Sequence, residues 1–250
     1  MTAGIALYHS ASSTCSQKVR LLLAEKRLPW YSHPLDLARL EQLSDRFLAL
    51  NPAGMVPVLV HDGAVIREST VISEYIEDRF PDRPMRPADP AGRARMREWT
   101  QRISQVATGA IKIPSFNVKL KARAQAFDAQ ALALIEARMP DREAAARWLR
   151  IARGGHGNSQ IRASLDILGR LLDQAAAALD RDRWLAGTDL SLADLDLAPF
   201  THRLAEIGQQ AMITARPSLA RWYGDLASRP SFRIAMNLGS SGLIAAPAPA

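Results

Sequence analysis

Residues 51–70 read NPAGMVPVLVHDGAVIREST and hold two short apolar segments around an Asp-Gly pair. The first segment is β-branched, Asp62 and Gly63 suit a turn with positive φ, and residues 64–67 return, so the stretch predicts an antiparallel hairpin. Pro57 has no amide hydrogen, which restricts it to the start or the edge of a sheet. We therefore expect the main chain beside Pro57 to serve something other than the sheet.

Helical spacing takes over after the hairpin. Apolar residues recur on one face over residues 72–80, and Pro81 follows the predicted end of the helix. Glu68 and Ser69 then lie at the junction of strand and helix. Free amides and the positive end of a helix favour a carboxylate at that place.

The amino-terminal part of the chain carries the hydroxyl groups expected to do chemistry. Residues 5–8 predict a first strand, and residues 12–26, SSTCSQKVRLLLAEK, predict a helix that begins among serines and threonines. Most such residues only cap the helix. One hydrogen bond to a charged group contributes about 1.5–3 kcal/mol, and lowering a thiol pKa by two units requires roughly 2.7 kcal/mol. A serine hydroxyl here can therefore stabilise the thiolate form of a thiol that lies beside it.

These motifs resemble the glutathione transferase family. Val56 and Pro57 match the residue that pairs with the glutathione backbone and the cis-proline after it, with Met55 beside them, and Glu68 and Ser69 match the pair that holds the γ-glutamyl end. The resemblance implies glutathione as co-substrate. It also implies the transferase fold, an α/β thioredoxin-like N-terminal domain followed by an all-α helical domain.

Three residues are candidates for the group that activates the glutathione thiol, and the sequence does not choose among them. One alignment of the segment 12–26 with bacterial transferases places Ser13 at the usual catalytic hydroxyl, whereas a shifted alignment favours Ser16. Cys15 is the third candidate, because a thiol at a helix start can be an activated thiolate. Cys15 begins C-x-x-K rather than C-x-x-C, so two-cysteine disulfide exchange within one chain is excluded.

The length and the prolines predict two domains. We expect a thioredoxin-like glutathione-binding domain over 1–82, a proline-rich linker over 83–90, a helical domain with the acceptor-substrate pocket over 91–235, and an Ala/Pro tail over 236–250.

Three features of the second half support a helical domain. Residues 93–113 predict a helix that Pro114 kinks or ends, and apolar steps of three and four over 161–179 predict a helix buried on one face. Ser191 and Asp194 in SLAD form a capping box like that of the sixth helix of glutathione transferases. We assign this box to stability and not to the active site.

Residues 139–160, MPDREAAARWLRIARGGHGNSQ, form an insertion relative to the minimal family plan. Its Gly-Gly-His-Gly loop lacks the preceding strand and the Lys-Ser/Thr ending of a phosphate-binding loop, so we interpret it as a turn. The five histidines are scattered without ligand spacing, and we expect no metal site.

The charge pattern bears on whether the protein binds nucleic acid, and the cysteine content bears on its cellular compartment. Lys and Arg number 32 against 25 Asp and Glu, a net charge of +7, but the two signs are interspersed and no nucleic-acid motif accompanies them. We expect no nucleic-acid partner. The single cysteine cannot form an internal disulfide, and neither a leader nor an apolar run near eighteen residues is found. We expect a cytoplasmic protein without a membrane span.

Residues 68–101 also resemble bacterial glutathione-dependent β-etherases, which cleave the β-aryl ethers of lignin. The likeness is good over roughly the first 105 residues and only in outline beyond them. It implies a hydrophobic aromatic acceptor attacked by the glutathione thiolate, with release of a phenol. For the acceptor pocket we choose apolar and polar residues near Pro114, where a helix break favours a cavity: Trp99, Gln105, Ile111, Ser115 and Phe116.

Three hypotheses for function follow. The first is a glutathione transferase of β-etherase type, the second a glutathionyl reductase or thiol transferase that uses Cys15, and the third a non-enzymatic ligand-binding subunit. The resemblance further implies a homodimer or a heterodimer with a related subunit. The sequence leaves open the acceptor, its stereochemistry, the type of dimer and the role of the insertion.

Overall fold

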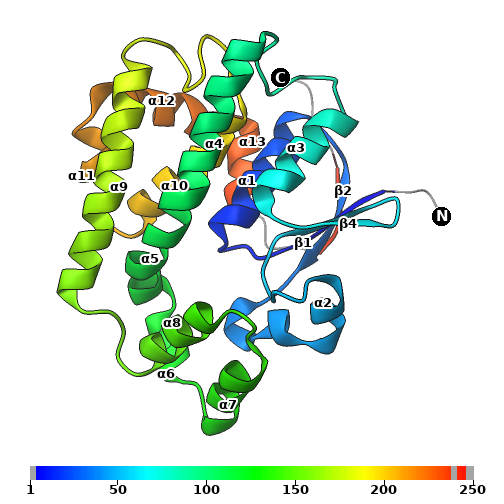
Figure 1. Cartoon of the computed structure of the whole chain (residues 1–250), viewed down its shortest axis with the longest axis vertical. Helices are drawn as coiled ribbons and strands as arrows, with labels where there is room; N and C mark the ends of the chain where they lie inside the picture. Colours follow the sequence, from blue (N-terminus) through cyan, green and yellow to red (C-terminus); the bar gives the residue numbers. More distant parts are fainter. Residues whose placement is uncertain (1–3, 238–240, 246–250) are drawn as a thin grey trace.

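The protein is described by a computed structural model that covers residues 4–237 and 241–245. A five-stranded sheet with the order β4-β3-β1-β2-β5 lies on the right of Figure 1 with the first helices of the chain beside it, and the later helices occupy the left. The strands are β1 (Ile5–His9), β2 (Trp30–Pro34), β3 (Val58–His61), β4 (Ala64–Ile66) and β5 (Gly242–Ile244).

The sheet is mixed. Strands β1 and β2 are parallel, with Leu7 opposite Ser32, whereas β3 runs antiparallel to β1 and β4 runs antiparallel to β3. The predicted hairpin is confirmed, because Asp62 and Gly63 form its turn with φ of 51° and 81°. This connectivity is the thioredoxin-like arrangement expected for the first half of the chain.

The helices cover the sheet and build the second half of the molecule (Figure 1). They are α1 (Thr14–Glu25), α2 (Asp45–Leu50), α3 (Ser69–Arg79), α4 (Pro90–Ala110), α5 (Lys112–Lys119), α6 (Lys121–Gln125), α7 (Ala129–Arg138), α8 (Arg142–Ala152), α9 (Asn158–Leu179), α10 (Leu192–Glu206), α11 (Ala211–Thr214), α12 (Pro217–Ala227) and α13 (Pro230–Asn237), with the short 3-10 helices η1 (Leu37–Arg39) and η2 (Glu41–Leu43).

Part of the predicted Ala/Pro tail over 236–250 is ordered as a strand. Residues 242–244 form β5, which pairs antiparallel with β2 at the edge of the sheet, and Trp30 lies opposite Ile244. An edge strand offers unpaired amides and carbonyls, so a short extended segment can add to it without sequence preference. Residues 238–240 and 246–250 of the predicted tail lie outside the described residues.

The predicted helix over 93–113 is two helices in the structure, α4 and α5, which meet at Ile111. Pro114 lies in the first turn of α5 instead of ending a helix. A proline lacks the amide that would bond to the carbonyl four residues earlier, so the longer helix cannot continue through it. In the first turn of a new helix that amide has no partner within the helix, and the proline is tolerated.

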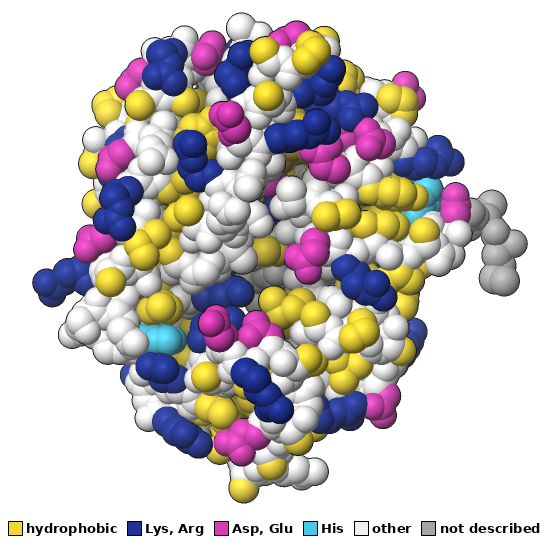
Figure 2. Space-filling model, in the orientation of Figure 1, with side chains coloured by type: hydrophobic (Ala, Val, Ile, Leu, Met, Phe, Trp, Pro, Cys, Tyr) yellow, Lys and Arg dark blue, Asp and Glu magenta, His cyan; other side chains and the backbone are white. Residues whose placement is uncertain are grey.

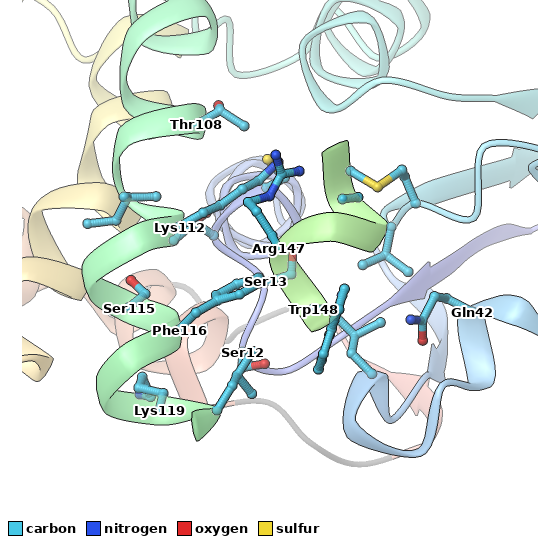
Figure 3. A pocket seen from close by; sticks show the side chains of 18 of the residues that line it. Ser12, Ser13, Gln42, Thr108, Lys112, Ser115, Phe116, Lys119, Arg147 and Trp148 are labelled. Atoms are coloured by element: carbon cyan, nitrogen blue, oxygen red, sulfur yellow. The ribbon is translucent and has the colours of Figure 1, made fainter. Parts of the chain in front are cut away.

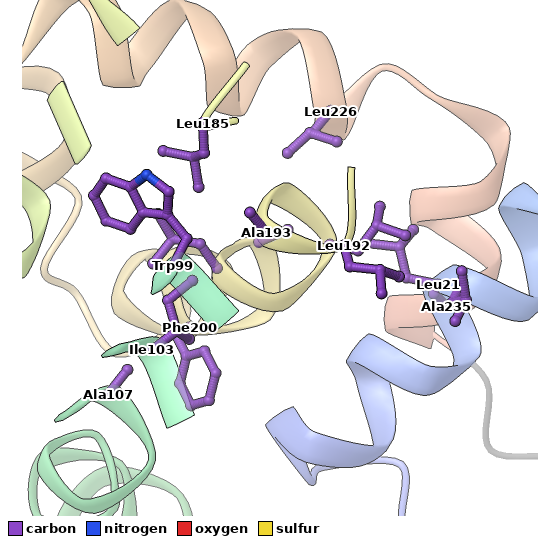
Figure 4. Close-up of a cluster of buried hydrophobic side chains, with 14 of the residues drawn as sticks. Leu21, Trp99, Ile103, Ala107, Leu185, Leu192, Ala193, Phe200, Leu226 and Ala235 are labelled. Carbon is purple, nitrogen blue, oxygen red and sulfur yellow. The ribbon is translucent and has the colours of Figure 1, made fainter. Parts of the chain in front are cut away.

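One large apolar core joins the sheet to the helical half. Figure 4 shows part of it, where Leu21 of α1 lies near Leu192 and Ala193 of α10, with Ala235 of α13 beside them. Helix α1 packs against both α10 and α13. The fully buried Lys18 of α1 also forms an ion pair of 3.0 Å with Asp196 of α10. The position of α1 is therefore set by both halves of the chain.

A second, smaller core lies under the insertion. Trp148 and Ile151 on α8 are buried with Ile135 of α7, and this group packs against Leu40 and Leu43 beside η2. The amphipathic pattern of α8 thus buries its apolar face against the first half of the chain.

The loop after α8 is a turn that ties it to α5. Gly154 and Gly155 have φ of 133° and 92°, which L side chains rarely adopt. Asn117 of α5 donates its side-chain amide to the carbonyl of His156 at 2.9 Å and accepts the His156 amide at 2.8 Å. The turn expected for the Gly-Gly-His-Gly sequence is what the structure contains.

Basic and acidic side chains are intermixed over the face shown in Figure 2. Over residues 4–237 and 241–245, the structure contains no helix whose length and apolar character would let it span a membrane.

The predicted capping box begins α10. Asp194 is completely buried and accepts four hydrogen bonds: from the amide of Leu185 at 2.9 Å, the indole of Trp222 at 2.9 Å, and the amide and hydroxyl of Ser191 at 3.0 and 2.9 Å. One carboxylate thus satisfies donors from α10, α12 and the preceding loop.

We predict that Asp194→Ala lowers the free energy of unfolding by roughly 3 kcal/mol or more, because several buried donors lose their acceptor. Urea denaturation measures this. The matched control is Asp189→Ala, which removes an exposed carboxylate five residues away and should change the free energy of unfolding by less than about 0.5 kcal/mol. Equal effects of the two substitutions would contradict the role given to Asp194.

A buried arginine lies under the loop that joins β1 to α1. The guanidinium of Arg20 donates to the carbonyls of Ser10 at 2.9 Å, Ala11 at 3.1 Å and Ala235 at 2.8 Å. It also lies 3.0 Å from Nδ1 of His9, whose Nε2 lies 2.9 Å from the hydroxyl of Ser32. We assign the His9 proton to Nε2, because Nδ1 faces a donor.

Burial, and then the charge of Arg20, lower the pKa of His9 to about 3. His9 is therefore neutral in the folded protein at pH values where the unfolded chain, with a pKa near 6.5, is protonated. The unfolded state binds the extra proton, so this histidine makes the fold less stable as pH falls from about 6.5 toward about 3.

We predict that the free energy of unfolding decreases on acidification in that range. His9→Gln should make this decrease less steep, and the two slopes should differ by at most about 1.4 kcal/mol per pH unit. Urea unfolding of both proteins at a series of pH values measures the two slopes. Parallel slopes would show that His9 is not held neutral.

Candidate active site

The loop over residues 9–13 and the first turn of α1 hold the candidate catalytic residues. Ser13 is the N-cap of α1, and its Oγ accepts a hydrogen bond from the amide of Ser16 at 3.2 Å. Its side chain is half-buried and lines a cavity. Among the described residues no acceptor is bonded to the Ser13 hydroxyl hydrogen, which is free to be donated to a ligand.

Ser16 has a different environment. It is completely buried, and its Oγ accepts a hydrogen bond from the amide of Ser10 at 3.3 Å. The Ser16 hydroxyl therefore braces the loop from below and does not line the cavity. Ser13 and Ser16 are equal candidates in the sequence, but in the structure only Ser13 lines the cavity.

Cys15 lies between them in the first turn of α1. It is half-buried and, with Thr14, lines the same cavity as Ser13. The first amides of a helix have no partner within it and carry the positive end of its dipole, so an anion near Ser13 and Cys15 would be stabilised.

The main chain beside Pro57 is free, as expected. The Val56–Pro57 peptide bond is cis. Over residues 4–237 and 241–245, the amide and carbonyl of Val56 have no hydrogen-bond partner, whereas Val58, two residues on, pairs with Tyr8 of β1. Met55 and Val56 line the cavity that Ser13 also lines. An extended peptide can therefore pair with Val56 as it would with a sheet edge.

Glu68 and Ser69 begin α3, and their backbone is unusual. Glu68 is the N-cap residue with φ of 64° and ψ of 115°, a conformation that costs free energy for any residue except glycine. Strain of this kind at an exposed helix start is a reason to infer function. Among the described residues these two side chains and Pro57 lie outside the cavity lining.

The cavity lies between the two halves of the chain (Figure 3). One wall is the start of α1 and the loop before β3, and the opposite wall is α5 and α8. The rings of Phe116 and Trp148 lie 5.6 Å apart in that second wall, tilted by 51°. The cavity is therefore bounded by the serine loop and by two aromatic rings, a lining suited to an apolar ligand.

The structure brings three of the five predicted acceptor residues to this cavity: Ile111, Ser115 and Phe116. Ser115 is buried, and its Oγ has no hydrogen-bond partner among the described residues. Trp99 belongs instead to the large core, as Figure 4 shows, and Gln105 is exposed on α4. Residues 99 and 105 precede the break at Ile111, so the direction of their side chains follows α4 and not α5.

Several cavity residues were missed from sequence. They are mainly polar or cationic and come from four segments: Gln42, Lys112, Lys119, Arg147, Trp148 and Arg203. Lys112 and Lys119 share helical spacing with the predicted residues 115 and 116, which is a usable signal. Arg147 and Trp148 belong to the insertion, and only the packing of α8 against η2 brings them to the site.

No group of three or more His, Cys, Asp or Glu side chains in the described part of the chain is arranged to hold a metal ion.

Comparison with known proteins identifies related chains. A model of the glutathione S-transferase N-terminal domain matches residues 7–84, and a model of the C-terminal domain matches residues 119–230. The protein LigF of Sphingobium sp. is 32% identical over 234 residues, which cover 91% of this chain and 91% of that protein. Glutathione S-transferase F13 of Arabidopsis thaliana is 28% identical over 230 residues, 90% of this chain and 92% of that protein.

Solved structures of glutathione transferases share the fold of this chain. The crystal structure of the beta-etherase LigF from Sphingobium superimposes with a TM-score of 0.86 at 30% identity, over 93% of this chain and 98% of that chain. Glutathione transferase F7 from Populus trichocarpa gives a TM-score of 0.73 at 28% identity, over 94% and 100%. With both domain models matched and the fold shared throughout, this chain belongs to the glutathione S-transferase family, whose enzymes use glutathione as co-substrate.

Proposed function

We propose that the protein cleaves β-aryl ethers with glutathione and that Ser13 activates the thiol. The observation that carries this proposal is the free, half-buried hydroxyl of Ser13 at the start of α1, which faces a cavity also lined by Val56 and by the Phe116 and Trp148 rings. The likeness to the beta-etherase LigF over most of the chain supports the choice of ether cleavage.

Glutathione is proposed to lie along the first wall of the cavity. The amide and carbonyl of Val56 pair with its backbone next to Met55, and Glu68 and Ser69 at the start of α3 hold its γ-glutamyl end, on the far side of Pro57. The free groups of Val56 and the strained backbone of Glu68 support this placement. The thiol then reaches the start of α1.

The reaction is a substitution at carbon. The Ser13 hydroxyl donates a hydrogen bond to the glutathione sulfur and stabilises the thiolate, aided by the first amides of α1. The thiolate attacks the carbon that bears the aryl ether next to a ketone. A carbon–sulfur bond forms, the carbon–oxygen bond breaks, and the aryl oxygen leaves with the electron pair as a phenolate that takes a proton from water.

We predict that Ser13→Ala lowers the turnover of an α-aryloxy ketone between about tenfold and about 100-fold, the loss expected for one charge-assisted hydrogen bond. It should also raise the pKa of bound glutathione, read from the ultraviolet absorbance of the thiolate, while glutathione affinity changes little. A substrate with para-nitrophenol as its leaving group reports turnover by colour.

Ser16→Ala is the matched control, because it removes a hydroxyl three residues away that does not line the cavity. It should leave the pKa of bound glutathione unchanged, and Ser13→Thr should restore activity. If Ser13→Ala lowers turnover by no more than twofold, the proposed role of Ser13 fails, and if Ser16→Ala also lowers it by no more than twofold, the serine mechanism as a whole fails. Glutathione binding without turnover of any aryl ether or generic electrophile would instead favour a ligand-binding subunit.

A second function is favoured by the position of Cys15, which lines the same cavity at the same helix start. In this function its thiolate attacks glutathione disulfide, a mixed disulfide forms on Cys15 and one glutathione leaves. Treatment with glutathione disulfide followed by mass spectrometry should then give an adduct on Cys15, and Cys15→Ser should abolish thiol-transferase activity. An unmodified Cys15, with ether cleavage retained in Cys15→Ser, excludes this second function.

We also propose the division into domains over 1–82 and 91–235 with a linker over 83–90, a dimer with a second copy or a related subunit, a cytoplasmic location, and lignin-type aryl ethers as substrates. The family likeness supports these proposals.

A further inference from the structure

The charged side chains that line the cavity in the described part of the chain are all cationic. The described lining contains Lys112, Lys119, Arg147 and Arg203, and no Asp or Glu. Glutathione chemistry at Ser13 does not require four cations in the cavity lining, so their role needs an explanation.

Two of the four cations share one carboxylate partner. Glu206 accepts from Nζ of Lys119 at 2.6 Å and from Nε of Arg203 at 2.6 Å. Arg203 also donates to the carbonyl of Ser12 at 2.6 Å, so this group braces the loop before α1. Lys119 and Arg203 are thereby committed to structure.

Lys112 and Arg147 have no comparable partner. Within residues 4–237 and 241–245, Lys112 forms no hydrogen bond or ion pair with another side chain, although it is half-buried. Arg147 reaches Asp141 and Glu143 only at 3.8 and 3.7 Å, beyond hydrogen-bond distance, and both carboxylates are exposed. Such exposed pairs stabilise little.

The two cations also converge. Figure 3 shows the side chains of Lys112 from α5 and Arg147 from α8 extending to the same place in the cavity, above the Phe116 and Trp148 rings. Burial, and then the charge of Arg147, lower the pKa of Lys112. The exposed Asp141 and Glu143 offset part of this repulsion, but two like charges brought together in a partly buried cavity still favour an anion between them.

We propose that Lys112 and Arg147 form a subsite for a carboxylate carried by the aromatic part of the acceptor, so that the preferred substrates are aryl acids and not neutral aryl compounds. This inference deepens the proposed function and rests on it. The Phe116 and Trp148 rings in the same cavity lining support an acceptor group as the occupant, because glutathione is placed along the free main chain of Val56, in a different segment of the lining.

The test compares three ligands by isothermal titration calorimetry: glutathione, S-benzylglutathione and S-(para-carboxybenzyl)glutathione. The last two differ only by the carboxylate on the ring. Wild-type protein should bind the carboxylated conjugate about tenfold or more tightly than the benzyl conjugate, as expected for a charge-assisted contact. The difference should shrink as salt is raised.

Lys112→Met and Arg147→Met should each remove most of that difference while leaving the affinity for glutathione and S-benzylglutathione in place. Lys112→Arg should retain it. Lys121→Met is the matched control, since Lys121 lies on α6 outside the cavity lining, and it should bind all three ligands as the wild type does.

Equal affinity of the wild type for the two conjugates overturns the inference. So does an equal loss for all three ligands in the Met variants, which would show that the cations hold a carboxylate of glutathione itself. Failure of the proposed function looks different, because it appears as an absence of ether cleavage in the turnover assays, or as no binding of glutathione and S-benzylglutathione, whereas this inference is read from the difference between two conjugates that both bind.

Discussion

The position of the serine loop depends most on the hydrogen bonds of the Arg20 guanidinium. This guanidinium is almost completely buried, and burial lowers its pKa to about 9, yet its hydrogen-bond partners are all polar groups of the end of β1, of the loop after it and of α13. Three carbonyls and His9 satisfy the buried cation. The same bonds hold the loop over 9–12 in one shape, and Ser13 therefore meets the cavity at the end of a braced loop instead of a mobile one.

The loop is braced from both halves of the chain. Arg203 of α10 binds the carbonyl of Ser12, the buried Lys18 of α1 pairs with Asp196 of α10, and Ala235 of α13 accepts from Arg20. A buried ion pair contributes little net free energy, but it penalises any other placement of its partners. We infer that the helical half does two things at once, since its helices α5 and α8 line the cavity and its helix α10 fixes the position of the serine loop.

The predictions that succeeded from sequence rest on local chemistry. The hairpin follows from Asp62 and Gly63 in a turn, the start of α10 from the capping box of Ser191 and Asp194, and the free main chain at Val56 from the missing amide of Pro57. The resemblance to glutathione transferases rests on the same local motifs. The role of the glutathione-binding residues stays a prediction, and the geometry supports it.

What sequence alone determined is which elements form and which motifs they carry, because capping, turn chemistry and apolar periodicity act within a few residues. What only the tertiary structure decided is which side chains share a cavity. Ser13 and Ser16 are equal candidates in sequence, but only Ser13 lines the cavity, and Trp99 on α4 lies in the large core instead of in the cavity lining. Arg147 meets Lys112 only because α8 packs back onto η2, a contact between segments about a hundred residues apart whose free energy comes from burial and not from any local motif.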